Sequence, residues 1–170
     1  MAEDFDLPLI SFIDTPGAYP GIESEERGMS EAIAKNLSLL SNLKTPVIVI
    51  ITGEGGSGGA LAIGIGDHVC MLEHSIYAVA SPEACASIVW RDGSKAKDAA
   101  EAMKVDAGSL QKLGLVDEVI KEPLGGAHRD LRGASNSISD VIEEKLSTFD
   151  EIEISDLLNK RYIKIMSYGS

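Results

Sequence analysis

Pro46-Val-Ile-Val-Ile-Ile51 is followed, after Thr52, by Gly53-Glu-Gly-Gly-Ser-Gly-Gly59, and this stretch gives the strongest indication of the architecture. The apolar run is too short for a helix and rich in β-branched residues, so we predict a buried strand with proline at its first position. The second segment holds five glycines in seven residues, and Ala60-Leu-Ala-Ile63 then resumes an apolar pattern that a helix can use. The expected order is therefore strand, glycine loop, helix.

Strand and helix patterns alternate on both sides of this stretch, from residue 9 to residue 120. Leu9 to Ile13 is an apolar run that ends in a Pro-Gly turn, which predicts a second buried strand. From Glu25 to Leu43 the apolar residues recur at helical spacing, which predicts a helix with Ser24 as its N-cap. We expect further strands over residues 69–72, 76–80 and 115–120, and helices from Pro82 towards Trp90 and over residues 96–104.

The character of the sequence changes beyond Pro123. Two helical stripes of apolar residues follow, one between Ser137 and Leu146 and one between Ile154 and Ile165. We therefore divide the chain into an α/β core of residues 1–122 and a helical extension of residues 123–170, which packs on the core or against another subunit.

Composition excludes several classes of function. The chain of 170 residues is long enough for one domain with a sizeable core. Its 15 Lys and Arg against 27 Asp and Glu give a net charge of −12, which argues against nucleic acid as a partner. The longest strongly apolar stretch, residues 47–51, is far short of the ~18 residues of a membrane span, and the acidic start does not resemble a secretory signal.

Cys70 and Cys85 lack CxxC spacing, so we expect buried thiols in a reducing compartment and no metal in this chain.

The glycine-rich segment is compatible with three kinds of chemistry. Gly53, Gly55 and Gly58 satisfy the dinucleotide pattern GxGxxG, and Glu73 follows about 20 residues on, where a ribose-binding acid belongs. The helix after the glycines is short for a βαβ crossover and contains Gly64, so an NAD-binding domain is only an alternative. A phosphate-binding P-loop is excluded, because the chain has no GxxxxGK[ST].

The third possibility is an oxyanion hole. Glycines expose backbone N–H groups at a helix start, so that an oxygen gaining negative charge can approach them. A glycine segment needed only for close packing of strand and helix is the structural alternative.

Five blocks in the same order resemble one enzyme family. They are Phe12-Ile-Asp-Thr-Pro-Gly-Ala-Tyr-Pro-Gly21, Glu25-Glu-Arg-Gly28, Gly53-Glu-Gly-Gly-Ser-Gly-Gly-Ala-Leu-Ala-Ile-Gly64, Ser81-Pro-Glu-Ala-Cys-Ala-Ser-Ile88 and Glu122-Pro-Leu-Gly-Gly-Ala-His-Arg129. Together they are similar to the carboxyltransferase alpha subunit of bacterial and plastid-type acetyl-CoA carboxylase. The similarity runs from about Leu7 to the end of the chain and covers only the C-terminal portion of that longer subunit.

The resemblance implies a crotonase-like (ClpP/crotonase) α/β spiral of ββα units with C-terminal helices. It also implies transfer of the carboxyl group from carboxybiotin, on the biotin carboxyl carrier protein, to acetyl-CoA, which gives malonyl-CoA in the first step of fatty-acid synthesis. The implied partner is a carboxyltransferase beta subunit that carries a zinc ribbon, in an α2β2 assembly. The implied location is the bacterial cytoplasm or the plastid stroma.

The resemblance also assigns the site. Gly58 and Gly59 match the glycine pair of the biotin-side oxyanion hole, and Gly17 and Ala18 match the second backbone donor. The residues expected to line the substrate site are Gly55, Gly56, Ser57 and Ala60. If Gly59 serves only to let the substrate approach, Gly59→Val should leave the fold largely intact and abolish transfer.

Three other functions remain alternatives. A ClpP-like serine peptidase would use Ser57, but His68 and His74 lie too early in the chain to provide its base. An acyl-CoA hydratase needs two acids, and only Glu83 matches one of them. The chain could also be an inactive piece of the alpha subunit that serves assembly alone.

Overall fold

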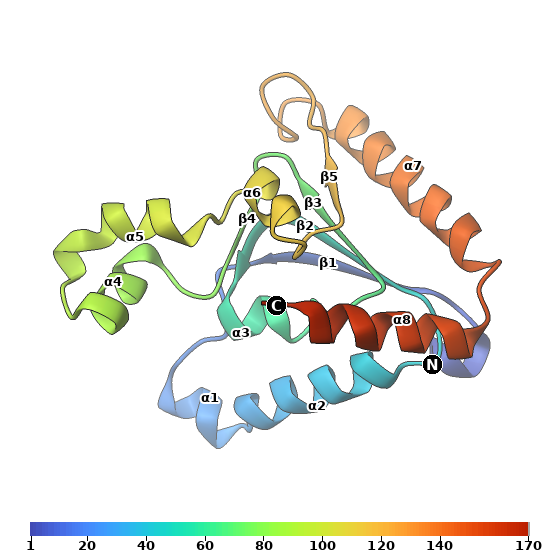
Figure 1. The fold of residues 1–170 in the computed structure, drawn as a ribbon, viewed down its shortest axis with the longest axis horizontal. Helices are drawn as coiled ribbons and strands as arrows, with labels where there is room; N and C mark the ends of the chain where they lie inside the picture. Colours follow the sequence, from blue (N-terminus) through green and yellow to red (C-terminus); the bar gives the residue numbers. More distant parts are fainter. Residues whose placement is uncertain (170) are drawn as a thin grey trace.

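The computed structural model describes residues 1–169, and its centre is a parallel sheet of five strands (Figure 1). Four strands lie in the order β1-β2-β3-β5, and β4 pairs with the carboxyl end of β2. The strands are β1 (Leu9–Thr15), β2 (Val47–Gly56), β3 (His68–Leu72), β4 (Ile76–Ala78) and β5 (Glu118–Ile120).

Strand β2 is the central strand, and its side chains are buried on both faces of the sheet. Val47, Val49 and Ile51 pack with Leu110 and its neighbours on one face, which we call the α6 face. Ile48 and Ile50 pack on the other face, the α7 face, under apolar side chains of α7 (Leu131–Phe149). The unbroken apolar run in the sequence reflects this burial on two sides, which is typical of parallel sheets.

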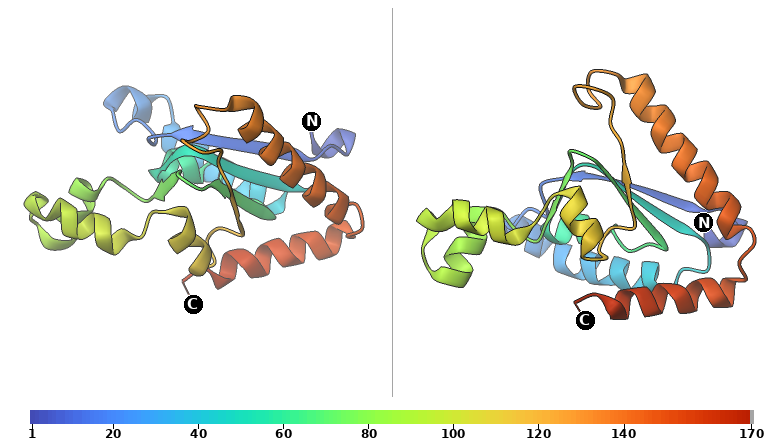
Figure 2. Two further views of the ribbon diagram at one scale, coloured as in Figure 1. Left: turned by 90° about the horizontal axis from the view of Figure 1, so that it is seen from above. Right: turned by 45° about the horizontal axis from the view of Figure 1, so that its top comes forward.

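The remaining helices differ in how closely they lie to this sheet. Figure 2 shows that α4 (Pro82–Trp90) and α5 (Ala96–Met103) stand away from it, joined by the short 3-10 helix η2 (Gly93–Lys95). The others are η1 (Glu3–Phe5), α1 (Ile22–Glu26), α2 (Met29–Asn42), α3 (Ser57–Leu61), α6 (Ala107–Lys112) and α8 (Ile154–Ser167). Within the described residues, no helix is both long enough and apolar enough to cross a bilayer.

A buried arginine fastens α8 to the rest of the fold. The Arg161 side chain is fully buried and forms a two-pronged ion pair with Asp67, through Nε at 2.9 Å and Nη2 at 2.6 Å. Its other N–H groups donate to the carbonyl oxygens of Leu40, Leu43 and Thr45. All five N–H donors of the guanidinium therefore have acceptors, which is the condition for burying such a charge.

Several sequence-based boundaries were wrong. The helix predicted from Glu25 is two helices separated by Gly28, which has a φ of +74°, so Ser24 lies inside α1 and is not an N-cap. Residues 53–56 continue β2 because Glu54, Gly55 and Gly56 pair with β4, so the glycine segment is strand up to Ser57. No pattern in the sequence predicted α6. Both cysteines are free, with Cys70 buried as expected and Cys85 only partly buried.

Candidate functional site

Two backbone segments meet at the carboxyl ends of β1 and β2. These neighbouring strands are parallel, so the turn after β1 and the start of α3 lie at the same edge of the sheet. A Cβ added to Gly56 would overlap the Pro16 carbonyl, and one added to Gly59 would lie 2.7 Å from both the Ala18 nitrogen and the Gly17 carbonyl carbon. Backbone therefore contacts backbone, and the structure brings the predicted donors Gly17, Ala18, Gly58 and Gly59 together.

Several N–H groups at this junction are available to a ligand. The N–H groups of Gly58 and Gly59 lie in the first turn of α3, where N–H groups have no partner within the helix, and the N-cap Gly56 offers no capping side chain. Within residues 1–169, no acceptor meets the Ala18 N–H. The Gly17 N–H instead donates to Thr15 Oγ1 at 3.3 Å. Ala18 is therefore the better candidate for the second donor.

An apolar pocket of about 330 Å³ opens beside the start of α3. Its lining contains no charged side chain and consists of Ser57, Gly58, Leu61, Tyr77, Ala78, Val79, Leu110 and Leu115. An apolar lining lowers the local dielectric, which strengthens hydrogen bonds from backbone donors to a developing negative charge.

The other predicted lining residues take different places. Gly55 and Gly56 border a smaller pocket of about 170 Å³ that also contains Pro16. Ala60 is fully buried in the α6 face, so its side chain is not available to a substrate. A role for Ala60 in the substrate site is therefore limited to its backbone.

Tyr77 is a pocket residue that the sequence did not reveal. Its ring lies against Gly55, and it borders both the main pocket and a neighbouring one of about 220 Å³ that contains Tyr168. Burial raises the pKa of the Tyr77 phenol, so it stays neutral at physiological pH. The sequence predicted a strand here, but the face on which Tyr77 lies depends on the pairing of β4 with β2.

Ser57 has an unusual backbone but no catalytic base. It is exposed, and its φ of +50° is rare for a residue with a side chain. No side chain in the described part of the chain hydrogen-bonds to its hydroxyl, and His68 is instead bound to Glu118 at 3.0 Å. A Ser–His pair of the peptidase kind is therefore not formed.

The geometry also disfavours dinucleotide binding. Asp14 Oδ1 accepts the Glu54 N–H at 3.0 Å, so a carboxylate already lies against the glycines of GxGxxG and would repel a phosphate. The predicted ribose ligand, Glu73, forms an ion pair with Lys121 at 2.7 Å. For the hydratase alternative, the pocket position that would need an acid is occupied by Leu61, and Glu83 does not border this pocket.

Comparison with known proteins gives consistent matches. The family model described as acetyl co-enzyme A carboxylase carboxyltransferase-like matches residues 1–169. The acetyl-coenzyme A carboxylase carboxyl transferase subunit alpha of Alcanivorax borkumensis is 58% identical over 170 residues, which are 100% of this chain and 53% of that protein. The subunit of the same name from Vibrio cholerae is 56% identical over 169 residues, 99% of this chain and 53% of that protein. The chain thus spans about half the length of these relatives.

Solved structures show the same fold. A transcarboxylase 12S structure with methylmalonyl-coenzyme A and methylmalonic acid bound is 25% identical, with a TM-score of 0.64 over 71% of this chain and 25% of that chain. A Pseudomonas malonate decarboxylase hetero-tetramer is 20% identical, with a TM-score of 0.70 over 94% of this chain and 66% of that one. These likenesses confirm the predicted crotonase-like α/β fold.

Proposed function

The chain belongs to the acetyl co-enzyme A carboxylase carboxyltransferase-like family, and from this we propose that it is the C-terminal portion of a carboxyltransferase alpha subunit. In this proposal it takes part in moving a carboxyl group from carboxybiotin to acetyl-CoA, which gives malonyl-CoA. The observation that supports the proposal best is the set of unpaired backbone N–H groups beside an uncharged pocket.

The residues at the junction suit the binding of a ureido ring whose oxygen becomes negatively charged. When bound, carboxybiotin would supply the carboxyl group, its ureido oxygen would gain negative charge as that group leaves, and its ring nitrogen would take the proton that the acetyl methyl loses. The N–H groups of Gly58 and Gly59 hold this oxygen, and the Ala18 N–H is the second backbone donor. A single donor of this kind is typically worth ~2.7–4 kcal/mol, or ~10²–10³ in rate. Leu61 and Tyr77 give this pocket part of its apolar lining.

The partners and the location are part of the same proposal. The donors described above provide one hole, so the thioester oxygen of acetyl-CoA requires a second one, which we assign to a beta subunit that carries the zinc ribbon. The biotin carboxyl carrier protein delivers the carboxybiotin, and the assembly is α2β2. Since the most similar relatives reported above are bacterial, we place the protein in the bacterial cytoplasm.

Reconstitution tests the proposed function. The chain would be mixed with the beta subunit of the Alcanivorax borkumensis enzyme, and malonyl-CoA decarboxylation would be measured with free biotin as acceptor. A chimera that adds the N-terminal part of the Alcanivorax borkumensis alpha subunit serves as the comparison. Activity of either protein supports the proposal. If the chimera is active and the chain binds the beta subunit without turnover, the chain serves assembly alone. If neither protein is active and neither binds the beta subunit, the proposal is contradicted.

A serine variant separates transfer from nucleophilic catalysis. We expect Ser57→Ala to retain turnover within a few-fold, because the proposed donors are backbone N–H groups and no base activates the hydroxyl. The measurement is transfer in the reconstituted assembly, together with a search for an acyl-enzyme by mass spectrometry. An acyl adduct on the unchanged protein that Ser57→Ala abolishes would restore the peptidase alternative.

A further inference from the structure

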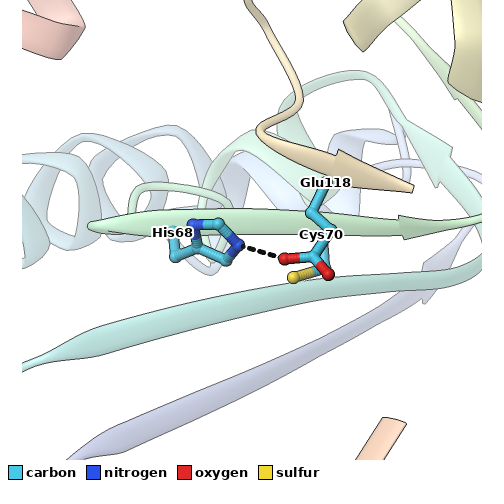
Figure 3. Close-up of side chains that lie close together, drawn as sticks. All are labelled: His68, Cys70 and Glu118. Atoms are coloured by element: carbon cyan, nitrogen blue, oxygen red, sulfur yellow. Dashed lines mark hydrogen bonds and ion pairs between the residues drawn. The ribbon is translucent and has the colours of Figure 1, made fainter. Parts of the chain in front are cut away.

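Three side chains with different donor atoms converge on the α7 face, away from the proposed active site. His68 and Cys70 alternate along β3 and therefore lie on one face, and Glu118 on β5 is the register partner of Cys70. The ligand atoms of the three residues all lie within 4.8 Å of one another. Figure 3 shows the His68 ring directed at the Glu118 carboxylate, with the Cys70 sulfur beside it.

The cluster is separate from the pocket. Cys70 belongs to the core of the α7 face, whereas the pocket residue Leu110 belongs to the α6 face on the opposite side of the sheet. The proposed carboxyl transfer depends on backbone N–H donors at the ends of β1 and β2. It does not involve His68, Cys70 or Glu118.

A cation already lies at the cluster. Lys145 of α7 reaches Glu118 with its Nζ at 3.2 Å and contacts Glu144 at 2.7 Å. Its side chain is only 19% exposed, so α7 partly closes the site. The second contact matters, because Lys145 can release Glu118 and remain paired with Glu144.

We propose that His68, Cys70 and Glu118 form a binding site for a zinc-type divalent cation. Imidazole nitrogen, thiolate sulfur and carboxylate oxygen are the three donor types that Zn²⁺ takes in proteins, with water in the fourth position. Mg²⁺ and Ca²⁺ prefer sites made of oxygen alone. The ion would join β3 to β5 beneath α7.

The metal ion would replace the Lys145 ammonium as the cation beside Glu118. Without the ion, the Cys70 thiol is neutral, because burial raises its pKa to about 12, and Lys145 offsets the charge of Glu118. On binding, the thiol proton passes to solvent and the sulfur forms its bond to the metal. Lys145 keeps its proton and moves to Glu144. Two anionic ligands then balance the two charges of the ion, and because only one proton leaves, the face becomes more positive by one charge.

The geometry requires a small movement. Tetrahedral ligands at about 2.0–2.3 Å from zinc lie roughly 3.3–3.8 Å apart. The His68 and Glu118 atoms are slightly closer than this, and no separation in the cluster exceeds it by more than about 1 Å. Rotation of the Cys70 and Glu118 side chains covers such a difference without moving the strands.

Metal titration of the purified chain tests the proposal without any assay of carboxyl transfer. We expect one equivalent of Zn²⁺ to remain bound after dialysis, and Co²⁺ to produce thiolate-to-metal charge-transfer absorption. Cys70→Ser should abolish that absorption and weaken Zn²⁺ binding by more than about 100-fold. Loss of a residue that only contacts a metal ligand typically costs about 10–100-fold. Cys85→Ser is the matched control and should change neither, because Cys85 lies on α4.

A second variant distinguishes a metal site from a purely structural ion pair. Lys145→Met removes the competing cation, so we expect it to bind Zn²⁺ more tightly than the unchanged chain, whereas a structural role of Lys145 predicts no gain. Glu118→Gln should weaken binding even if Cys70→Ser does not fold. The proposal is overturned if the chain retains less than one equivalent, if Cys85→Ser rather than Cys70→Ser loses the ion, or if Lys145→Met gains nothing.

Discussion

Replacing Arg161 with methionine is expected to lower the free energy of unfolding by about 3–5 kcal/mol, the usual cost of breaking a buried ion pair from one side. The substitution leaves the Asp67 side chain, which is 3% exposed, without its cation. It also removes the donors that satisfy the carbonyl oxygens of Leu40, Leu43 and Thr45. Urea unfolding followed by circular dichroism measures the loss.

Two further variants show whether the pair itself is responsible. Lys160→Met changes an exposed cation next to Arg161 on α8 and should alter stability by no more than about 0.5 kcal/mol. Arg161→Met combined with Asp67→Asn should be more stable than Arg161→Met alone, since the isolated buried charge is removed. If the double variant is no better than the single one, the loss comes from the carbonyl contacts or from packing. A single variant as stable as Lys160→Met would contradict the account of α8 given above.

Local signals in the sequence were sufficient for several elements. The β-branched run at residues 47–51 predicted the buried part of β2, and Pro82 predicted the start of α4. The structure adds that Ser81 accepts the Ala84 N–H as N-cap. The glycines at residues 53–56 were misassigned because glycine favours loops, whereas their strand conformation depends on pairing with β4. Helix α6 was missed because a helix of six residues has too little periodicity, although Asp106 caps it.

The site was predictable at the level of segments but not of individual side chains. The sequence placed the Gly17 turn and the start of α3 after two predicted strands, and the parallel pairing of β1 with β2 in the structure brings them to one edge. Gly58 and Gly59 differ in how much room a side chain would have, which depends on what a Cβ would touch and is given only by the structure. The cluster of His68, Cys70 and Glu118 joins residues about 50 positions apart, and His-x-Cys on one strand face was its only local signal.

Valine at Gly58 is expected to stop carboxyl transfer without unfolding the protein. A Cβ at Gly58 would meet only the flexible end of Ile33, at 3.4 Å, while Gly58 itself borders the pocket. The added methyl groups stand beside the N–H donors of α3 and hinder the approach of a ring to them. We expect transfer in the reconstituted assembly to fall by at least about 10²–10³, the value of one lost donor, with an unchanged melting temperature.

Gly59→Val should lose the same activity for a different reason, which revises the sequence-based expectation that it would fold normally. Its Cβ would lie 2.7 Å from the backbone of Gly17 and Ala18, and backbone cannot yield as a side chain does. Overpacking of this kind typically costs about 1–3 kcal/mol, so its melting temperature should fall while that of Gly58→Val does not. Equal stability of the two variants would show that Gly59 is not a packing residue. Full transfer by Gly58→Val would place the ring away from α3, because a bound ring at these donors cannot avoid the valine.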